Sequence, residues 1–591
     1  MAFPQYDGEV SLYAYDKDGM LVKAENSENL LEFTRDRKTG QIIEEKQGEY
    51  TVNRTYDSEG NCTRITSSLG ADIRHTYDRE GNLQTMQAGE SWQASWVRDN
   101  TGLEVQRTFS GGVTVRTERD CFGREVHKSV RSGGMEKGAY RYQWGIANRL
   151  LSKENELTGT VTRYDYDRFD FLIRQETMQG SETDVIYRTP DFVGNLFETP
   201  DKKDRKYGAG GKLLEDPDCF YHYDDEGNLI FREFKQLLET GVRFDRKRME
   251  KEQGIRCLAT GTGWLYEWSS NGMLKKVIRP DGRPVEFRYD ALGRRTAKQY
   301  FGKVTRWVWD GNVPIHEWSY KVTDRQSNEE EGSLLKEPTE DITTWVFEAG
   351  TFVPTAKIQE GKQYSIVSDY LGTPIQMYDE QGNKTWDCTL NICGIVTTFD
   401  GCSLNDCPFK FQGQYADEET GLYYNRFRYY SPEMGIYISS DPIGLAGGFN
   451  TYAYVKDTNT WVDVLGLSGE LVYQLIRDNK VVYYGITSRT ALERMAEHGK
   501  TKVFDNMEIL ADGLTHDQAR SIEGALIRQR LKERADDWSD FDSIKARLDK
   551  SGLDNRNRGR IKERWTSENP LDDLRDKIYK KPKKVKVGCK S

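Results

Sequence analysis

Proline and cysteine are scarce in this 591-residue chain, with 15 and nine copies, and long apolar runs are missing. The cysteines are scattered and include no Cys-x-x-Cys pair, which argues against a disulfide framework and a structural zinc site. Because no run of about 18 apolar residues occurs, no membrane span is expected. Residues Met1–Tyr13 lack the basic and apolar regions of a secretory signal peptide, so none is expected there.

Aromatic residues and glycine, by contrast, are abundant. The chain has 33 Tyr, 23 Phe, 13 Trp and 54 Gly, although only 36% of its residues are hydrophobic and its mean hydropathy is −0.78. A disordered chain would be poor in aromatic residues. The combination is typical of a β-protein with a polar surface and glycine-containing turns, and the length allows several domains.

Charge is divided unevenly along the chain. Residues 468–591 contain 27 Lys and Arg against 21 Asp and Glu, a net charge of +6. The remaining residues have 58 against 74, a net charge of −16. An acidic body therefore precedes a basic tail, and this asymmetry indicates a polyanionic partner for the tail.

A short unit, Tyr or Arg followed by Asp and then by Gly three or four residues later, recurs in the body. In six consecutive units the aspartates are 20 or 21 residues apart: Asp16, Asp36, Asp57, Asp78, Asp99 and Asp120. The aspartate can cap a turn and the glycine tolerates a positive φ, so each unit predicts a strand, a turn and a strand. A fixed period over six units favours a repeat array over a generic β-meander.

These units resemble the YD-repeat, or Rhs, proteins. The resemblance covers about residues 1–467 and includes further motifs at Trp307–Gly311, Trp345–Glu348, Asp369–Pro374, Gly413–Tyr415 and Glu419–Arg426. It implies a mostly β repeat shell, a spiral β-sheet cocoon that encloses a toxic C-terminal segment. Residues 1–400 are assigned to the repeat shell and 401–467 to the C-terminal conserved region with an autoproteolytic junction. A spiral sheet also protects its edges, because each turn pairs with the next.

Two aspartates near the end of the body are candidates for cutting a peptide bond. Asp441 begins Asp-Pro-Ile-Gly-Leu, and Asp463 begins Asp-Val-Leu-Gly-Leu. Two carboxyl groups that meet can share a proton and act as acid and base on one water. The resemblance to Rhs proteins implies self-cleavage after Leu467, with Asp441 and Asp463 as the carboxylate pair and Arg428 as the assisting arginine.

The junction departs from the family pattern at two positions. Val464 stands where the family usually has proline, and Ile436 stands where it usually has arginine. An alternative interpretation is that both aspartates only cap turns, as Asp before Pro or Gly often does.

The tail, residues 468–591, predicts a small α/β domain. Leu471–Ile476 and Lys480–Ile486 are strand-like and are separated by Asp478-Asn479, which predicts a hairpin. Ala491–His498 is helix-like, and a capping box at Thr515 and Gln518 opens a longer helix. Glu523 lies on the apolar face of that helix, where a carboxylate needs a cation or a hydrogen-bond partner.

This order of elements resembles the GIY-YIG endonucleases. Leu471-Val472-Tyr473 takes the place of the GIY motif, and Tyr483-Tyr484-Gly485 takes the place of YIG, ten residues later. The resemblance then implies a site composed of Tyr473, Tyr483, Arg494, His498, Glu523 and Asn555. In this site Tyr473 would be the general base, Tyr483 would orient the site, and Glu523 would bind a divalent cation such as Mg²⁺.

The resemblance also implies the remaining roles, and they fit the chemistry of phosphodiester hydrolysis. Arg494 would neutralise charge on the phosphate, because a guanidinium matches phosphate oxygens well. His498 lies one helical turn later and would assist proton transfer. Mg²⁺ suits an oxygen ligand such as Glu523 and would hold the leaving oxygen. As alternatives, the two tyrosines can be packing residues, and Arg494 and His498 can lie on a solvated helix face.

Two basic runs follow in the tail. Arg556, Arg558, Arg560 and Lys562, with Arg564 next, are expected to contact phosphates, which would make binding depend strongly on salt. The run Lys581–Lys590 is interpreted as a solvated face or a frayed end.

Together these features predict an Rhs-type polymorphic toxin with a metal-dependent DNase at its C-terminus. The resemblance implies a secreted effector, made in the bacterial cytoplasm and delivered to the cytoplasm of a competing cell. Its partners would be DNA as substrate, a cognate immunity protein and components of a delivery apparatus. The alternatives are an RNase or tRNase tail, and a non-enzymatic cell-surface protein that binds carbohydrate.

Overall fold

The structure is a computed structural model, and it describes residues 2–4, 10–235, 262–325, 337–444, 450–467, 470–477, 480–487, 506–514 and 578–585. The chain divides into two compact units. The first comprises Met1–Tyr15, Leu21–Ser440 and Tyr452–Gly466, and the second comprises Asp16–Met20, Asp441–Thr451 and Leu467–Ser591.

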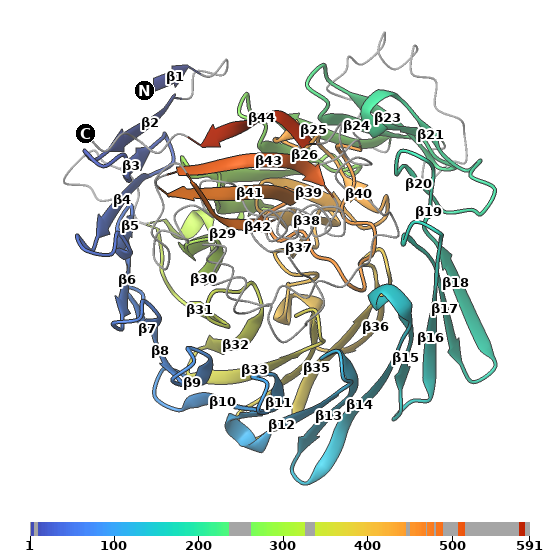
Figure 1. The fold of residues 1–591 in the computed structure, drawn as a ribbon. Coiled ribbons are helices and arrows are strands. Elements are labelled where there is room, and N and C mark those ends of the chain that lie inside the picture. The colour runs from blue at the N-terminus through green and yellow to red at the C-terminus, as the bar shows by residue number, and fades with distance from the viewer. Residues whose placement is uncertain are drawn as a thin grey trace, which may run out of the picture. The chain divides into compact units, whose positions relative to one another are not determined.

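The first unit begins with an 18-stranded antiparallel sheet in which each strand pairs with the next one along the chain (Figure 1). Its strands are β1 (Ala2–Pro4), β2 (Val10–Tyr15), β3 (Leu21–Glu25), β4 (Leu30–Arg35), β5 (Ile42–Gln47), β6 (Tyr50–Tyr56), β7 (Cys62–Ser67), β8 (Asp72–Tyr77), β9 (Leu83–Ala88), β10 (Trp92–Arg98), β11 (Glu104–Phe109), β12 (Thr114–Arg119), β13 (Glu125–Ser132), β14 (Met135–Trp144), β15 (Leu150–Asn155), β16 (Thr160–Tyr166), β17 (Leu172–Gln179) and β18 (Glu182–Tyr187). A short pair, β19 (Thr189–Pro190) and β20 (Leu196–Phe197), follows.

The repeat units form the turns between these strands, as the sequence predicts. In the unit of Asp57, the Oδ1 atom accepts hydrogen bonds from the backbone N–H of Glu59 at 3.0 Å and of Asn61 at 2.9 Å. Gly60 has a φ of +88°, a conformation that favours glycine. The strand–turn–strand prediction is therefore confirmed, because turn chemistry within five residues sets each hairpin.

A second, 16-stranded antiparallel sheet continues the first unit. Its strands are β21 (Lys206–Tyr207), β22 (Leu213–Glu215), β23 (Cys219–Tyr223), β24 (Leu229–Phe234), β25 (Gly263–Trp268), β26 (Leu274–Ile278), β27 (Pro284–Tyr289), β28 (Arg295–Tyr300), β29 (Lys303–Asp310), β30 (Val313–Lys321), β31 (Thr343–Phe347), β32 (Pro354–Gln359), β33 (Lys362–Ser368), β34 (Pro374–Tyr378), β35 (Lys384–Leu390) and β36 (Val396–Gly401). The helices of the described residues are single 3₁₀ turns: Ser110–Gly112, Ile146–Asn148, Ala209–Gly211, Val322–Asp324 and Leu404–Asp406.

The second sheet lies against the first as the next turn of a spiral (Figure 1). Gln47 of β5 donates a hydrogen bond to the carbonyl of Trp309, 262 residues later. Farther along, Trp92 of β10 donates to Ser365, 273 residues later. Such contacts continue to Gln175 of β17, whose Oε1 atom accepts from the N–H of Ile392, 217 residues later. Successive strands of one turn therefore face successive strands of the other.

Both faces of the second sheet are buried, and alternate residues serve the two faces. Val346 and Val367 belong to the hydrophobic cluster shared with the first sheet. Their neighbours Trp345 and Ile366 point the other way, into a cluster shared with residues 409–452. The second sheet is therefore the middle of three layers.

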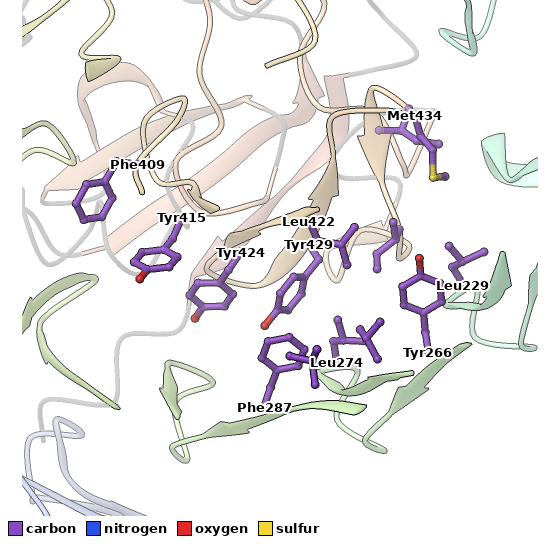
Figure 2. Close-up of a cluster of buried hydrophobic side chains, with 14 of the residues drawn as sticks. Leu229, Tyr266, Leu274, Phe287, Phe409, Tyr415, Leu422, Tyr424, Tyr429 and Met434 are labelled. Carbon is purple, nitrogen blue, oxygen red and sulfur yellow. The ribbon is translucent and has the colours of Figure 1, made fainter. Parts of the chain in front are cut away.

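A four-stranded antiparallel sheet forms the third layer, with β37 (Tyr415–Asp417), β38 (Leu422–Asn425), β39 (Arg428–Ser431) and β40 (Ile436–Tyr437). Figure 2 shows its rings, including Tyr415, Tyr424 and Tyr429, packed toward the second sheet. The Tyr429 and Tyr289 hydroxyls are 2.7 Å apart. Within the Tyr- and Arg-rich motif Glu419–Arg426, residues Leu422–Asn425 form strand β38.

The described residues of the second unit include a sheet with the order β42-β41-β43-β44. Its strands are β41 (Glu470–Arg477), β42 (Lys480–Thr487), β43 (Asn506–Leu514) and β44 (Ile578–Val585). The predicted tail hairpin is confirmed, because β41 and β42 pair antiparallel from Leu471 with Thr487 to Arg477 with Lys480. In the described part of the chain, no helix has the length and apolarity needed to cross a membrane.

Candidate functional site

Arg428 is the centre of a buried polar group at the end of the first unit. It begins β39, and its side chain is fully buried. Its Nε atom donates a hydrogen bond to the carbonyl oxygen of Gly466, and its Nη2 atom lies 3.4 Å from Oδ2 of Asp463. The guanidinium also stacks on the Tyr437 ring, with Cζ 3.7 Å from the ring centroid. One arginine therefore binds both ends of the segment 463–466.

Asp463 is held by a second set of side chains. The Tyr437 hydroxyl donates a 2.9 Å hydrogen bond to Oδ2 of Asp463. Asn425 Nδ2 donates to the Tyr437 oxygen at 2.7 Å and to the backbone carbonyl of Asp463 at 2.8 Å. Burial, reinforced by the Asp463 carboxylate, raises the pKa of Tyr437 well above its ordinary value, so its hydroxyl stays a donor.

Two glycines allow the segment to lie close to its surroundings. Gly413 has a φ of +87°, and a Cβ there would be 2.2 Å from the carbonyl oxygen of Val464. Gly466 has a φ of +69°, and a Cβ there would be 2.6 Å from the carbonyl oxygen of Asn425. The backbone at Val464 is thus packed directly on Gly413, and the backbone at Gly466 is packed directly on Asn425 of β38.

Asp441 belongs to the second unit, whereas Arg428 and Asp463 belong to the first. Its N–H donates to the carbonyl of Thr451 at 2.9 Å, and its Oδ1 atom accepts from the N–H of Ile443 at 3.0 Å. Asp441 therefore caps a local turn, as the alternative interpretation expects. The structure brings Arg428 and Asp463 together, and the pairing of Asp463 with Asp441 stays a prediction.

Tyr437 and Asn425 were not among the residues predicted for this site. Asn425 lies inside a family motif recognised in the sequence, but nothing local distinguishes it from its neighbours. Tyr437 follows Ile436, one of the two departures from the family pattern, and its contacts come from segments 12 and 26 residues away. No sequence spacing would have identified either residue.

In the tail, two of the predicted nuclease residues lie in described strands. Tyr473 of β41 is opposite Gly485 of β42, and Tyr483 is opposite Leu475. Because residues two apart lie on the same face of a strand, Tyr473 and Tyr483 occupy diagonal positions on one face of the hairpin. Arg494, His498, Glu523, Asn555, Arg556, Arg558, Arg560 and Lys562 lie outside the described residues, as do the two predicted tail helices.

Of the two interpretations of the run Lys581–Lys590, the frayed end does not hold for its first residues, and the solvated face stays a prediction. These first residues belong to the edge strand β44. There Lys583 pairs with Ile509 and Lys584 pairs with Glu508. The lysine-rich composition concealed the strand, because lysine is depleted in strands generally but common on exposed sheet edges.

Comparison with known proteins defines the class of the body. Residues 104–475 match the Teneurin YD-shell family, so this chain belongs to that family. A solved structure of the Photorhabdus luminescens Tc holotoxin pore has a similar fold, with a TM-score of 0.52 and 15% identity over 78% of this chain and 26% of that one. The prediction of a YD-repeat β-shell is confirmed.

Curated relatives give more specific similarities. The chain is 29% identical over 445 residues to the probable deoxyribonuclease RhsB of Dickeya dadantii, which covers 72% of this chain and 28% of that protein. It is 28% identical over 523 residues to the double-stranded DNA deaminase toxin A of Burkholderia cenocepacia, which covers 82% of this chain and 34% of that protein. The chain thus spans about a third of the length of these relatives.

Proposed function

We propose that this chain is the shell and C-terminal toxin of an Rhs-type polymorphic toxin. The shell would enclose residues 468–591, cut the chain after Leu467, and so free a metal-dependent DNA endonuclease for use against competing cells. Membership of the YD-shell family and the similarity to proteins named as a deoxyribonuclease and a DNA deaminase toxin support a toxin with DNA as its target.

In the proposed cleavage, Asp441 and Asp463 share one proton. The ionised carboxylate takes a proton from water as the water oxygen bonds to the carbonyl carbon of Leu467. The protonated carboxyl then gives its proton to the nitrogen of Ser468 as the C–N bond breaks. Both new ends are ordinary termini, and no covalent intermediate with the protein is needed.

The contacts of Arg428 with the residues before the proposed cut are the observation that carries this proposal. Its guanidinium contacts both the Gly466 carbonyl and the Asp463 carboxylate in a buried setting. Such a contact fixes the backbone one residue before the proposed cut and compensates the charge of a buried carboxylate. Proximity and orientation of this kind can supply a large share of a rate enhancement.

Intact mass of the purified full chain tests the cleavage. Wild-type protein is expected to split after Leu467, and Asp441→Asn and Asp463→Asn are expected to stay whole. Asp457→Asn is a matched control, because Asp457 is also buried and caps a turn with its Oδ1 atom. An uncut wild-type chain, or cleavage that survives both junction variants, would contradict the proposal.

For the released tail, we propose the following roles. Tyr473 takes the proton of the attacking water, Tyr483 orients the site, and Arg494 neutralises the phosphate, with His498 assisting and Asn555 completing the set. Glu523 would hold Mg²⁺, which supplies charge neutralisation at the leaving oxygen when bound. Arg556, Arg558, Arg560 and Lys562 would contact the DNA backbone. The diagonal positions of Tyr473 and Tyr483 on one hairpin support this assignment.

Incubation of the cleaved protein with plasmid DNA, with and without Mg²⁺, tests the tail. Strand cleavage that requires Mg²⁺ and is lost in Tyr473→Phe and Glu523→Ala is expected. Cleavage of RNA but not DNA would favour the RNase or tRNase alternative. Altered bases without strand cleavage would favour a deaminase, which the name of one relative makes a specific competitor.

Partners and location follow from the same proposal. A toxin of this kind needs a delivery apparatus, acts in the cytoplasm of the target cell, and requires a cognate immunity protein in the producing cell. The remaining alternative is a non-enzymatic cell-surface protein that binds carbohydrate, and a tail without any activity on nucleic acid would favour it.

A further inference from the structure

The segment 463–466, which precedes the proposed cut, is bound through its main chain. Three of its four carbonyl oxygens accept hydrogen bonds from the hairpin that joins β38 to β39. These bonds run from Asn425 Nδ2 to Asp463 at 2.8 Å, from the Phe427 N–H to Leu465 at 3.2 Å, and from Arg428 Nε to Gly466. The fourth carbonyl, that of Val464, lies directly against Gly413.

The side chains of Val464 and Leu465, by contrast, are only half-buried. Neither belongs to the two hydrophobic clusters that the third layer forms in the described part of the chain. Main-chain hydrogen bonds give affinity without selecting a sequence, because every residue type carries the same carbonyl, whereas selection needs pockets for side chains. Valine at position 464, where the family usually has proline, is therefore compatible with all of these contacts.

Gly466 is the one position of the segment where the residue type matters for the main-chain contacts. It is buried and has a φ of +69°, a conformation that favours glycine. A Cβ there would be 2.6 Å from the carbonyl oxygen of Asn425 and 3.3 Å from the backbone nitrogen of Arg428. Both neighbours are backbone atoms of the binding hairpin, so a side chain at Gly466 would push the segment away from it.

We propose that the shell recognises its own cleavage segment by the main chain of residues 463–466, and that Gly466 is the residue that determines specificity. Asp463 is fixed by its proposed catalytic role, whereas positions 464 and 465 accept other side chains. This inference rests on the proposed self-cleavage, and it adds which part of the junction the shell recognises.

Time courses of intact mass for the full chain test the recognition. Val464→Ala and Leu465→Ala are expected to be cut after Leu467 within about threefold of the wild-type rate, as half-buried side chains contribute little. Gly466→Ala is expected to be cut at least about tenfold more slowly, because the reacting groups are misplaced. Gly421→Ala is the matched control, since Gly421 has a φ of +71° but open space around its Cβ position, and it should keep the wild-type rate.

A tenfold slower cut or a different cleavage position in Val464→Ala or Leu465→Ala would overturn the proposal, and so would a wild-type rate in Gly466→Ala. The unfolding temperature of each variant separates slow cleavage from loss of the fold. Should Gly466→Ala fail to fold, the two alanine variants at 464 and 465 still decide between recognition of the main chain and recognition of side chains.

Amide hydrogen exchange tests the same contacts without cleavage. In the Asp441→Asn background, which is expected to stay whole, the bond of the Phe427 N–H to the Leu465 carbonyl should protect this amide. Adding Gly466→Ala is expected to speed its exchange at least about fivefold, and adding Leu465→Ala is expected to leave it unchanged. The opposite pattern would refute the recognition. An uncut wild-type chain that shows the expected exchange would contradict only the self-cleavage.

Discussion

Glu45 of the first sheet forms an ion pair with Arg294, which follows β27, 249 residues later, and both side chains are almost completely buried. Arg54 binds the other oxygen of Glu45 at 3.0 Å, and Asp290 pairs with Arg294 at 2.7 Å. This network joins two turns of the spiral. Because every charge in it has a partner, it tolerates burial that an isolated charge would not.

Loss of Glu45 is therefore expected to destabilise the shell. Glu45→Ala removes one of the two counter-charges of Arg294, which keeps Asp290, and of Arg54, which keeps Asp310. We expect a cost of up to about 3 kcal/mol, the lower end of the cost of leaving a buried charge uncompensated. Thermal unfolding followed by circular dichroism measures the effect. The control is Glu32→Ala, because Glu32 forms a half-exposed pair with Lys46 whose loss should change stability by less than about 1 kcal/mol. Similar decreases in the unfolding temperature of the two variants would contradict a special role of the buried network in stability.

Stability should fall on mild acidification because of His316. Burial lowers the pKa of His316 from 6.5 to about 4, and its two ring nitrogens contact Ser67 at 2.6 Å and Thr344 at 3.1 Å. The unfolded chain binds this proton near pH 6.5 but the folded chain only near pH 4. The stabilisation is thus complete above pH 6.5 and is lost as the pH falls toward 4, by about 3 kcal/mol.

Unfolding of His316→Asn at several pH values isolates this contribution. The stability difference between wild type and variant should shrink between pH 6.5 and 4, because asparagine has no proton to bind there. His127→Asn is a control, since His127 is more exposed and pairs with Glu156. A difference that is constant across this window would rule out the His316 contribution.

Removal of the Tyr437 hydroxyl should slow the proposed self-cleavage. Tyr437→Phe takes a donor from the Asp463 carboxylate and an acceptor from Asn425, so at least a tenfold slower cut is expected. A time course of intact mass measures the rate. Tyr430→Phe is the matched control, because the Tyr430 hydroxyl is bonded to the carbonyl of Cys393 instead. Equal rates in wild type and Tyr437→Phe would show that the hydroxyl plays no part.

A methyl group at Gly413 should have a larger effect on cleavage than on folding. The added Cβ would lie 2.2 Å from the Val464 carbonyl and push the junction from its place. Gly421→Ala is the control, because Gly421 also has a positive φ, +71°, but has open space around its Cβ position. In the same mass assay, Gly413→Ala is expected to stay whole and Gly421→Ala is expected to be cut. Cleavage of both variants would contradict the importance of the close packing at Val464.

Local chemistry made much of the fold predictable. The turn at Asp57 uses only bonds within four residues, so the repeated Asp and Gly reveal every such hairpin in advance. The hairpin of Tyr473 and Tyr483 was equally evident from two apolar runs around a short turn. The strand of Lys583 was missed, because its polar composition hides a pairing that depends on β43.

By itself, the sequence determined that the body is a β-repeat array, where its turns lie, and which aspartates and arginine at its end deserve testing. Only the tertiary structure decided that Tyr437 and Asn425 hold Asp463. The reason is physical: turn geometry depends on a few neighbouring residues. Contacts between layers depend on the curvature of whole sheets, which brings together residues such as Glu45 and Arg294, 249 positions apart.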